Sequence, residues 1–231
     1  ALSSNSTPFG YWTRYNGTPL YDAATKTTAV KPADAQKYLE LFKDYRNNGL
    51  VPPADIAAGY AETNADTSMV IAGKAAIGFI WTNQLAGYQA ATTDELCLME
   101  FPGAAATKAL WQAPSQFYTV NKNSKYPEAA VKFINFLVNS PEAAKVLGND
   151  RGASASATAR AAGAADINDR KVLEYLDVAG PHSSKETDHV PNDTEFNSTL
   201  FLIYQKVAFG QISTAAGGQQ IYDLIVRLIK K

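Results

Sequence analysis

The chain has 231 residues, 46% of them hydrophobic, which suits one large folded domain or two modest ones and excludes an intrinsically disordered chain. Its 21 basic and 22 acidic residues nearly cancel, so it lacks the positive charge expected of a nucleic-acid-binding protein. No apolar run approaches the ~20 residues of a membrane span. Residues 1–12 have neither the basic nor the apolar part of a signal peptide, and we expect none here.

Helical periodicity is the clearest local signal after residues 1–30, which show no period and are expected to be irregular. Apolar residues at the spacing of one helix face predict helices over Ala33–Asn48, Pro127–Val138, Glu195–Phe209 and Thr214–Lys230. Shorter helices are expected near 67–72, after Pro141 and around Val172–Leu176. The expected N-caps are Asp66, Ser124, Ser140 and Ser213, whose side chains can accept from the first backbone amides.

Three short apolar segments predict strands rather than helices. They are Ala75–Trp81, Glu95–Phe101 and Ser115–Asn121, each shorter than a typical helix. A few short strands separated by helices predict an α/β chain. Cys97 lies in the second segment and is expected to be buried. It is the single cysteine and cannot form an internal disulfide, so cysteine usage does not indicate whether the protein works in an oxidising or a reducing compartment.

The stretch AGKAAIGFIWTNQLAGY, residues 72–88, combines a predicted strand with a predicted helix. Gly73 can adopt the left-handed conformation that ends a short helix, and Thr82 can cap the helix that follows the strand. Trp81, Asn83 and Gln84 would then lie at the carboxyl end of the strand. Open α/β sheets bind their ligands at that end. On this stretch alone, the favoured interpretation of Trp81 is a core aromatic residue.

Four groups of motifs carry a resemblance to a known family. They are residues 17–22 with 48–52, residues 73–85, residues 124–142 with Arg151-Gly152, and residues 209–213. In this order and at this spacing, the chain resembles the extracellular solute-binding proteins of bacterial ABC importers, the carbohydrate-binding family that includes maltose-binding protein. The family often has Pro two residues after the Arg-Gly pair, whereas Ala153-Ser154 follows here.

The resemblance implies a periplasmic-binding-protein-like fold of two α/β lobes, of which this chain is the C-terminal portion. Residues 1–113 and 159–231 would form the second lobe, and residues 114–158 would cross to the first lobe and return. The missing N-terminal lobe is therefore an expected partner. On this expectation the apolar stripe of the helix at 127–138 is exposed in the chain alone. The stripe consists of Ala130, Phe133, Ile134 and Leu137.

The same resemblance implies a function. We expect a binding protein rather than an enzyme, without cofactor or metal. It would capture a carbohydrate, with an oligosaccharide as the expected form, and deliver it to the membrane subunits of an ABC importer. The expected location is extracytoplasmic, in the periplasm or lipid-anchored at the cell surface.

The candidate ligand contacts are aromatic, amide and guanidinium side chains. Sugars present C–H faces that stack on flat rings and hydroxyl rims that bind planar polar groups. The resemblance implies that Trp81 stacks on a sugar. The full set is Trp81, Asn83, Gln84, Trp111, Gln112, Trp12, Arg14, Arg151 and Asn197. Alternatives remain, because Trp111 could pack at a hinge, Trp12 could lie at the surface, and Arg151 could form an interlobe ion pair.

Other function classes have weaker support in the sequence. His182 and His189, with Asp188 between them, lack the tight grouping of metal ligands. The chain has no G-x-S-x-G, H-E-x-x-H or phosphate-binding glycine loop. A glycosidase needs only two carboxylates, which sequence spacing cannot exclude, so a hydrolase stays the lesser alternative. The main alternative is a binding protein for a peptide, a polyamine or an anion.

Overall fold

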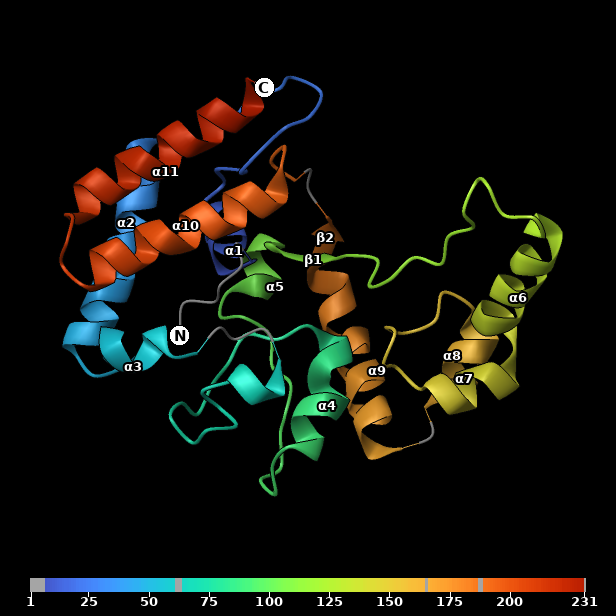
Figure 1. Cartoon of the computed structure of the whole chain (residues 1–231). Helices are drawn as coiled ribbons and strands as arrows, with labels where there is room; N and C mark the ends of the chain where they lie inside the picture. The colour runs from blue at the N-terminus through green and yellow to red at the C-terminus, as the bar shows by residue number, and fades with distance from the viewer. Residues whose placement is uncertain (1–6, 61–63, 165, 187–188, 231) are drawn as a thin grey trace. The chain divides into compact units, whose positions relative to one another are not determined.

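The structure is a computed structural model that describes residues 7–60, 64–164, 166–186 and 189–230 (Figure 1). The described residues divide into two compact units. Unit 1 comprises Ala1–Phe79, Pro102–Trp111 and His182–Lys231, and unit 2 comprises Ile80–Phe101 and Gln112–Pro181. These bounds differ from the expected divisions after residues 113 and 158, and the assignment of segments to lobes stays a prediction.

Unit 1 is built mainly from helices. Four helices carry its core: α1 (Thr7–Tyr15), α2 (Pro32–Asn47), α10 (Asp193–Ala208) and α11 (Thr214–Ile229). The shorter elements are α3 (Ala54–Ala58), η1 (Ala65–Thr67), α5 (Ala104–Thr107), β1 (Leu110–Gln112) and β2 (Ser183–Lys185). α11 packs along α2 (Figure 1). Gly218 permits this approach, because a Cβ there would lie 2.6 Å from the Pro32 carbonyl oxygen.

The core of unit 1 is centred on aromatic rings. Tyr38 is 2% exposed and packs edge-to-face on Phe9 and Phe42, with ring centroids 5.1 and 5.0 Å away. Tyr204 reaches the same ring from α10 at 5.7 Å. Burial raises the pKa of both tyrosines, so both hydroxyls stay protonated.

Unit 2 contains shorter helices in two groups. The elements are η2 (Thr82–Gln84), α4 (Leu85–Ala90), α6 (Pro127–Asn139), α7 (Pro141–Leu147), α8 (Ala157–Gly163), α9 (Ile167–Ala179) and η3 (Gly180–His182), which ends at the boundary with unit 1. α4 packs on α9, whereas α6, α7 and α8 pack on one another. No residue of α6 is buried, and Phe133 and Phe136 are 60% and 47% exposed. Of the expected stripe, Phe133 is exposed, whereas Ala130, Ile134 and Leu137 are half-buried, so the expected exposure is met only in part.

The long helices were predictable from the sequence, and the four predicted ranges match α2, α6, α10 and α11 to within about two residues. Ser140 and Ser213 cap α7 and α11, as predicted, by accepting from backbone amides. Ser124 does not cap α6. It lies two residues before the N-cap position, which Tyr126 occupies, and its hydroxyl accepts from the Tyr126 amide.

Other local predictions were wrong. α1 lies in the region expected to be irregular. The helix expected at 67–72 is replaced by the 3₁₀ turn η1, capped by Asn64, not Asp66. Gly73 does have a positive φ of 66°, but it closes a turn. Thr82 lies inside η2, and Trp81 occupies the N-cap position.

The three predicted strands are the main correction. Residues 75–81, 95–101 and 115–121 form no strand; the strands among the described residues are β1 and β2, which pair with each other. An apolar run becomes a strand only where a neighbouring strand accepts its hydrogen bonds, and these segments have no such neighbour in the described chain. Ile77 is accordingly 65% exposed, and Cys97 is exposed rather than buried.

Candidate functional site

The predicted segment around Trp81 forms a compact polar turn in unit 2. The Trp81 amide donates to Gln84 Oε1 at 2.8 Å, which fixes the turn that begins η2. Leu85 and Tyr88 are 1% and 3% exposed and hold α4 in place behind it. The Trp81 ring, in contrast, is 42% exposed. A large aromatic ring on a fixed backbone with this exposure can stack on the face of a ligand.

Asn83 connects this turn to a loop distant in sequence. Its Nδ2 donates to the Asp150 carbonyl oxygen at 3.4 Å, and no described residue donates to its Oδ1. The contact brings Asn83 beside Arg151, although the two are far apart in the sequence. The structure thus places four candidate residues in one region: Trp81, Asn83, Gln84 and Arg151.

The loop that carries Arg151 is held from α9. Asp169 is 7% exposed, and its Oδ1 accepts from the Asn149 amide at 2.8 Å. Asn149 Nδ2 donates in return to the Asp169 carbonyl oxygen at 3.1 Å. Because Asp166 caps α9 by accepting from the Asn168 and Asp169 amides, the loop is fixed to a helix terminus.

Arg151 itself is oriented but only partly engaged. Its Nη1 donates to Gln116 Oε1 at 3.2 Å, and its Nε lies 3.4 Å from Asp150 Oδ2. The side chain is 54% exposed, and its Nη2 donates to no described residue. Gly152, with a φ of 89°, lets the loop pass Ser115, since a Cβ on Gly152 would lie 2.4 Å from Ser115 Cβ. A guanidinium with a remaining donor can bind a hydroxyl pair or a carboxylate.

A second group of candidates lies in unit 1 around Arg14. Arg14 Nε donates to the Ala109 carbonyl oxygen at 2.8 Å, and its Nη2 donates to Ser184 Oγ. Its guanidinium carbon lies 5.2 Å from the centroid of the Trp111 ring, within cation–π range. Burial lowers the pKa of Arg14, and nearby Glu186 partly opposes this shift. Arg14 therefore joins α1 to both strands and orients Trp111.

The remaining candidates make contacts of other kinds. Trp12 packs on the core, 5.9 Å from Tyr38 between ring centroids. Asn197 Nδ2 donates to the Asp193 carbonyl oxygen and to Asp193 Oδ2, both at 2.9 Å, within α10. Gln112 is exposed at the end of β1. The role of each as a ligand contact stays a prediction.

Several residues that shape these groups were missed by the sequence interpretation. Asn149, Asp169, Gln116 and Ser184 each act through a contact with a residue at least 20 positions away. The sequence signals that could have pointed to this loop are a possible N-cap at Asp166, which the interpretation did not use, and the Arg-Gly pair.

Metal ligation finds no support in the described part of the chain, where no group of three or more His, Cys, Asp or Glu residues could hold an ion. His189 Nε2 lies 3.0 Å from Glu186 Oε1, whereas Asp188 falls outside the described residues. Within the same described residues, no helix combines the length and apolarity needed to cross a bilayer.

Solved structures with the same fold include three informative ones. An extracellular solute-binding protein of family 1 from Alicyclobacillus acidocaldarius superposes with a TM-score of 0.81 at 26% identity, covering 99% of this chain and 60% of that one. A periplasmic oligogalacturonide-binding protein from Yersinia enterocolitica, in complex with saturated digalacturonic acid, gives 0.82 at 24% identity, with 98% and 58% coverage. A de novo designed cysteine esterase gives 0.73 at 26% identity, with 96% and 56% coverage.

These matches confirm the periplasmic-binding-protein-like α/β fold that the sequence predicted, here in a mostly helical portion. The chain spans about 60% of the length of the proteins it matches. The designed esterase shares the fold, and its engineered activity says nothing about catalysis here. Residues 1–173, well over half of the chain, also match the family described as bacterial extracellular solute-binding protein, a class of binding proteins that act outside the cytoplasm. The chain belongs to this family of bacterial extracellular solute-binding proteins.

Proposed function

We propose that this chain is part of a binding protein that captures an oligosaccharide and delivers it to the membrane subunits of an ABC importer. The observation that carries the proposal is the turn at Trp81. There an aromatic ring that is 42% exposed adjoins the Asn83 amide, which in turn touches the loop of Arg151. A flat ring, an amide acceptor and a guanidinium donor together match the faces and rims of a sugar.

Arg151 refines the choice among carbohydrates. Its unengaged Nη2 can pair with a uronic-acid carboxylate as well as with vicinal hydroxyls. The matched Yersinia protein is described in complex with digalacturonic acid, which is an acidic sugar. This likeness supports a carbohydrate as the ligand here and makes acidic oligosaccharides worth testing beside neutral ones.

We also propose that the remaining contacts to the ligand come from a second lobe. The chain covers about 60% of the matched structures, and binding proteins of this type close two lobes on their ligand. Residues 1–113 and 159–231 would form one lobe, and residues 114–158 would belong to the other. The protein would act in the periplasm or as a lipoprotein at the cell surface.

A thermal-shift screen of the full-length protein tests the proposal. Neutral oligosaccharides, galacturonate oligosaccharides, peptides, polyamines and inorganic anions would be compared. A true ligand raises the melting temperature with concentration, because it stabilises the native state by about 2.7 kcal/mol at a hundred times its Kd. A shift by peptides or polyamines alone would contradict the sugar proposal, and turnover of a glycoside would contradict the assignment as a binding protein.

A further inference from the structure

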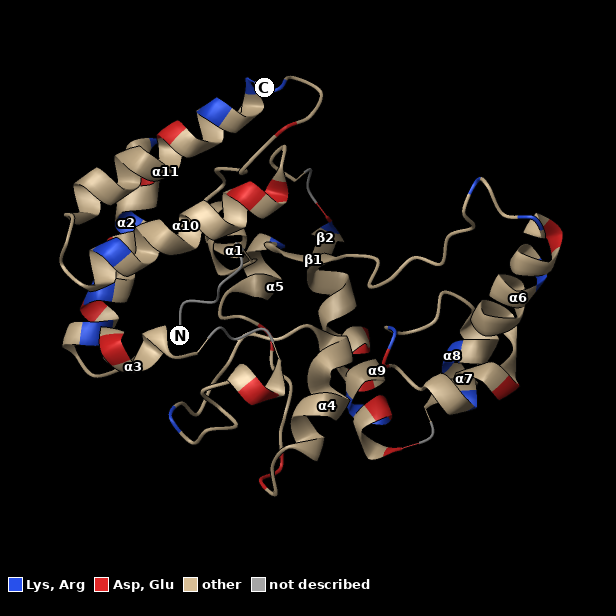
Figure 2. Ribbon diagram, viewed as in Figure 1, with Lys and Arg blue, Asp and Glu red and all other residues tan. Residues whose placement is uncertain are grey.

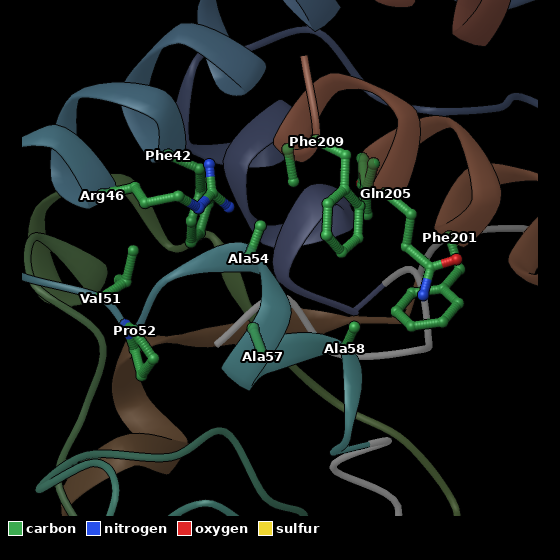
Figure 3. A pocket seen from close by; sticks show the side chains of 12 residues that line it. Phe42, Arg46, Val51, Pro52, Ala54, Ala57, Ala58, Phe201, Gln205 and Phe209 are labelled. Atoms are coloured by element: carbon green, nitrogen blue, oxygen red, sulfur yellow. The ribbon is translucent and has the colours of Figure 1, made fainter. Parts of the chain in front are cut away.

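A hollow in unit 1 is too small to select a saccharide. Residues of α2, α3 and α10, together with the connection at 51–52, line it (Figure 3). Its volume is about 30 Å³, and its walls, which include Phe42 and Phe201, are mostly apolar. Such a volume holds about one or two water molecules, whereas small-molecule pockets measure roughly 300 Å³ or more. Exposed polar groups are better candidates for ligand selection, and in unit 2 they include those around Arg151.

The loop between α7 and α8, which carries Arg151, is fixed from three segments that are distant in the sequence. The Asp150 carbonyl oxygen accepts from Asn83 Nδ2 at 3.4 Å, and a loop amide donates to Asp169 Oδ1 at 2.8 Å. In the third contact, Arg151 Nη1 donates to Gln116 Oε1 at 3.2 Å. The Arg151 side chain is thus held in place although it is 54% exposed. A charged group that is positioned in advance loses little freedom when a ligand binds it.

Gln116 is a neutral acceptor beside this guanidinium. Because an arginine side chain only donates, the Gln116 amide presents its oxygen to Arg151, and its NH2 group keeps two donors of its own. Gln116 therefore orients the guanidinium without neutralising it. A Glu at this position could accept the same hydrogen bond, but it would add a negative charge and remove both donors.

The charges that meet in this loop balance one another among the residues that the structure describes. Asp150 Oδ2 lies 3.4 Å from Arg151 Nε, but Asp150 is 71% exposed, and an ion pair with this exposure is weak. Asp169 brings a second negative charge. Arg160 brings a second positive charge, since its Nη1 donates to a carbonyl oxygen of the same loop at 2.7 Å. The side chain at position 116 therefore decides the sign of the charge beside the guanidinium.

We propose that Gln116 is a specificity-determining residue that lets Arg151 accept a saccharide with a carboxylate, such as a uronic-acid unit. The ligand carboxylate pairs with the guanidinium, and the Gln116 NH2 group adds a donor beside it. The contacts of Arg151 with described residues use two of its five N–H donors, so donors remain for the ligand. This inference rests on the proposed function and adds to it the charge of the ligand and the residue that selects it.

Calorimetric titration of the full-length protein with two matched saccharides tests the inference. Digalacturonate and the neutral digalactoside of the same linkage differ in carrying carboxylates or hydroxymethyl groups. The wild type should bind the acidic saccharide about tenfold more tightly or better. Gln116→Glu should weaken binding of the acidic saccharide by about tenfold, because it places a like charge beside the ligand carboxylate. Binding of the neutral saccharide should change by less than about threefold, because it carries no charge to be repelled.

Asp150→Asn should act in the opposite direction. It removes the negative charge near Arg151 Nε and keeps the backbone carbonyl that Asn83 contacts, so binding of the acidic saccharide should strengthen by about threefold. Gln220→Glu on α11 is the matched control, because it adds the same charge at an exposed position of unit 1 and should leave both affinities unchanged. Added salt should reduce the effects of Gln116→Glu and Asp150→Asn, as it does for exposed charges.

The possible outcomes separate this inference from the proposed function. Equal losses for both saccharides in Gln116→Glu would mean that Gln116 only holds the loop, and they would overturn the inference. An acid preference that Gln116→Glu leaves unchanged, or equal affinities of the wild type for both saccharides, would also overturn it while the proposed function stands. If neither saccharide binds and a peptide or polyamine raises the melting temperature, the proposed function fails, and this inference fails with it.

Discussion

At the scale of single residues, the tryptophans of this chain have different surroundings and should respond differently to truncation. Trp81 is 42% exposed at the start of η2, whereas Trp12 packs on the aromatic core beside Tyr38. Trp111 is half-buried, and the Arg14 guanidinium lies over its ring. The sequence interpretation favoured Trp81 as the sugar contact and left Trp111 and Trp12 with structural alternatives. Exposure and ring contacts, which depend on tertiary structure, separate them.

We expect Trp81→Ala to weaken oligosaccharide binding by about 1–3 kcal/mol, the usual effect of truncating a well-placed aromatic anchor. The melting temperature should change little, because much of the ring is already solvated. Calorimetric titration beside thermal unfolding of the full-length protein measures both. Trp12→Ala is the control, and it should lower the melting temperature because its ring packs on the core. Unchanged affinity with a large drop in melting temperature for Trp81→Ala would identify Trp81 as a structural residue.

At the scale of elements, the loop at 148–152 depends on backbone conformations that suit glycine. Gly152 and Gly210 both have positive φ, 89° and 70°. A Cβ on Gly152 would meet Ser115, whereas a Cβ on Gly210 would meet nothing within 4 Å. An alanine at position 210 would therefore be subject to backbone strain alone, whereas an alanine at position 152 would also clash with Ser115.

We expect Gly210→Ala to lower the free energy of unfolding by about 1–2 kcal/mol, the cost of the left-handed conformation for a residue with a Cβ. Gly152→Ala should cost more, because Ser115 must also move. Ser115→Gly should recover the difference in the double variant, as measured by denaturant unfolding. Equal costs for the two Gly→Ala changes would mean that the 148–152 loop does not pack on Ser115.

The elements also show what could be predicted from the sequence. Helices such as α10 and α11 follow from local periodicity and caps, because their hydrogen bonds close within the same segment. The segment at 75–81 has the composition of a strand but forms none, because a strand needs a partner segment for its hydrogen bonds and no described residue supplies one. The same holds for the site. Trp81 and Asn83 are candidates that a local pattern proposes, whereas the Asn149–Asp169 contact that fixes the loop is visible only in three dimensions.

At the scale of the whole molecule, α6 in unit 2 leaves large apolar side chains exposed on the side that carries Phe133 and Phe136. The two residues are one turn apart and are 60% and 47% exposed, and α6 contains no buried residue. Figure 2 shows that charged residues are sparse along this helix. A helix with a strong apolar face is normally buried against another element. We propose that α6 packs against the part of the matched structures that this chain does not cover.

Hydrogen exchange of the chain by itself tests this proposal. The amides of α6 should exchange faster than those of α11, whose Ile221, Ile225 and Leu228 are fully buried. Phe133→Ala should leave the melting temperature unchanged, whereas Phe196→Ala, at 0% exposure, should cost about 3–5 kcal/mol. In the full-length protein, α6 should gain protection, and Phe133→Ala should become destabilising because its ring is then buried. Protection of α6 as strong as that of α11 in the monomeric chain would show that its apolar face needs no further partner.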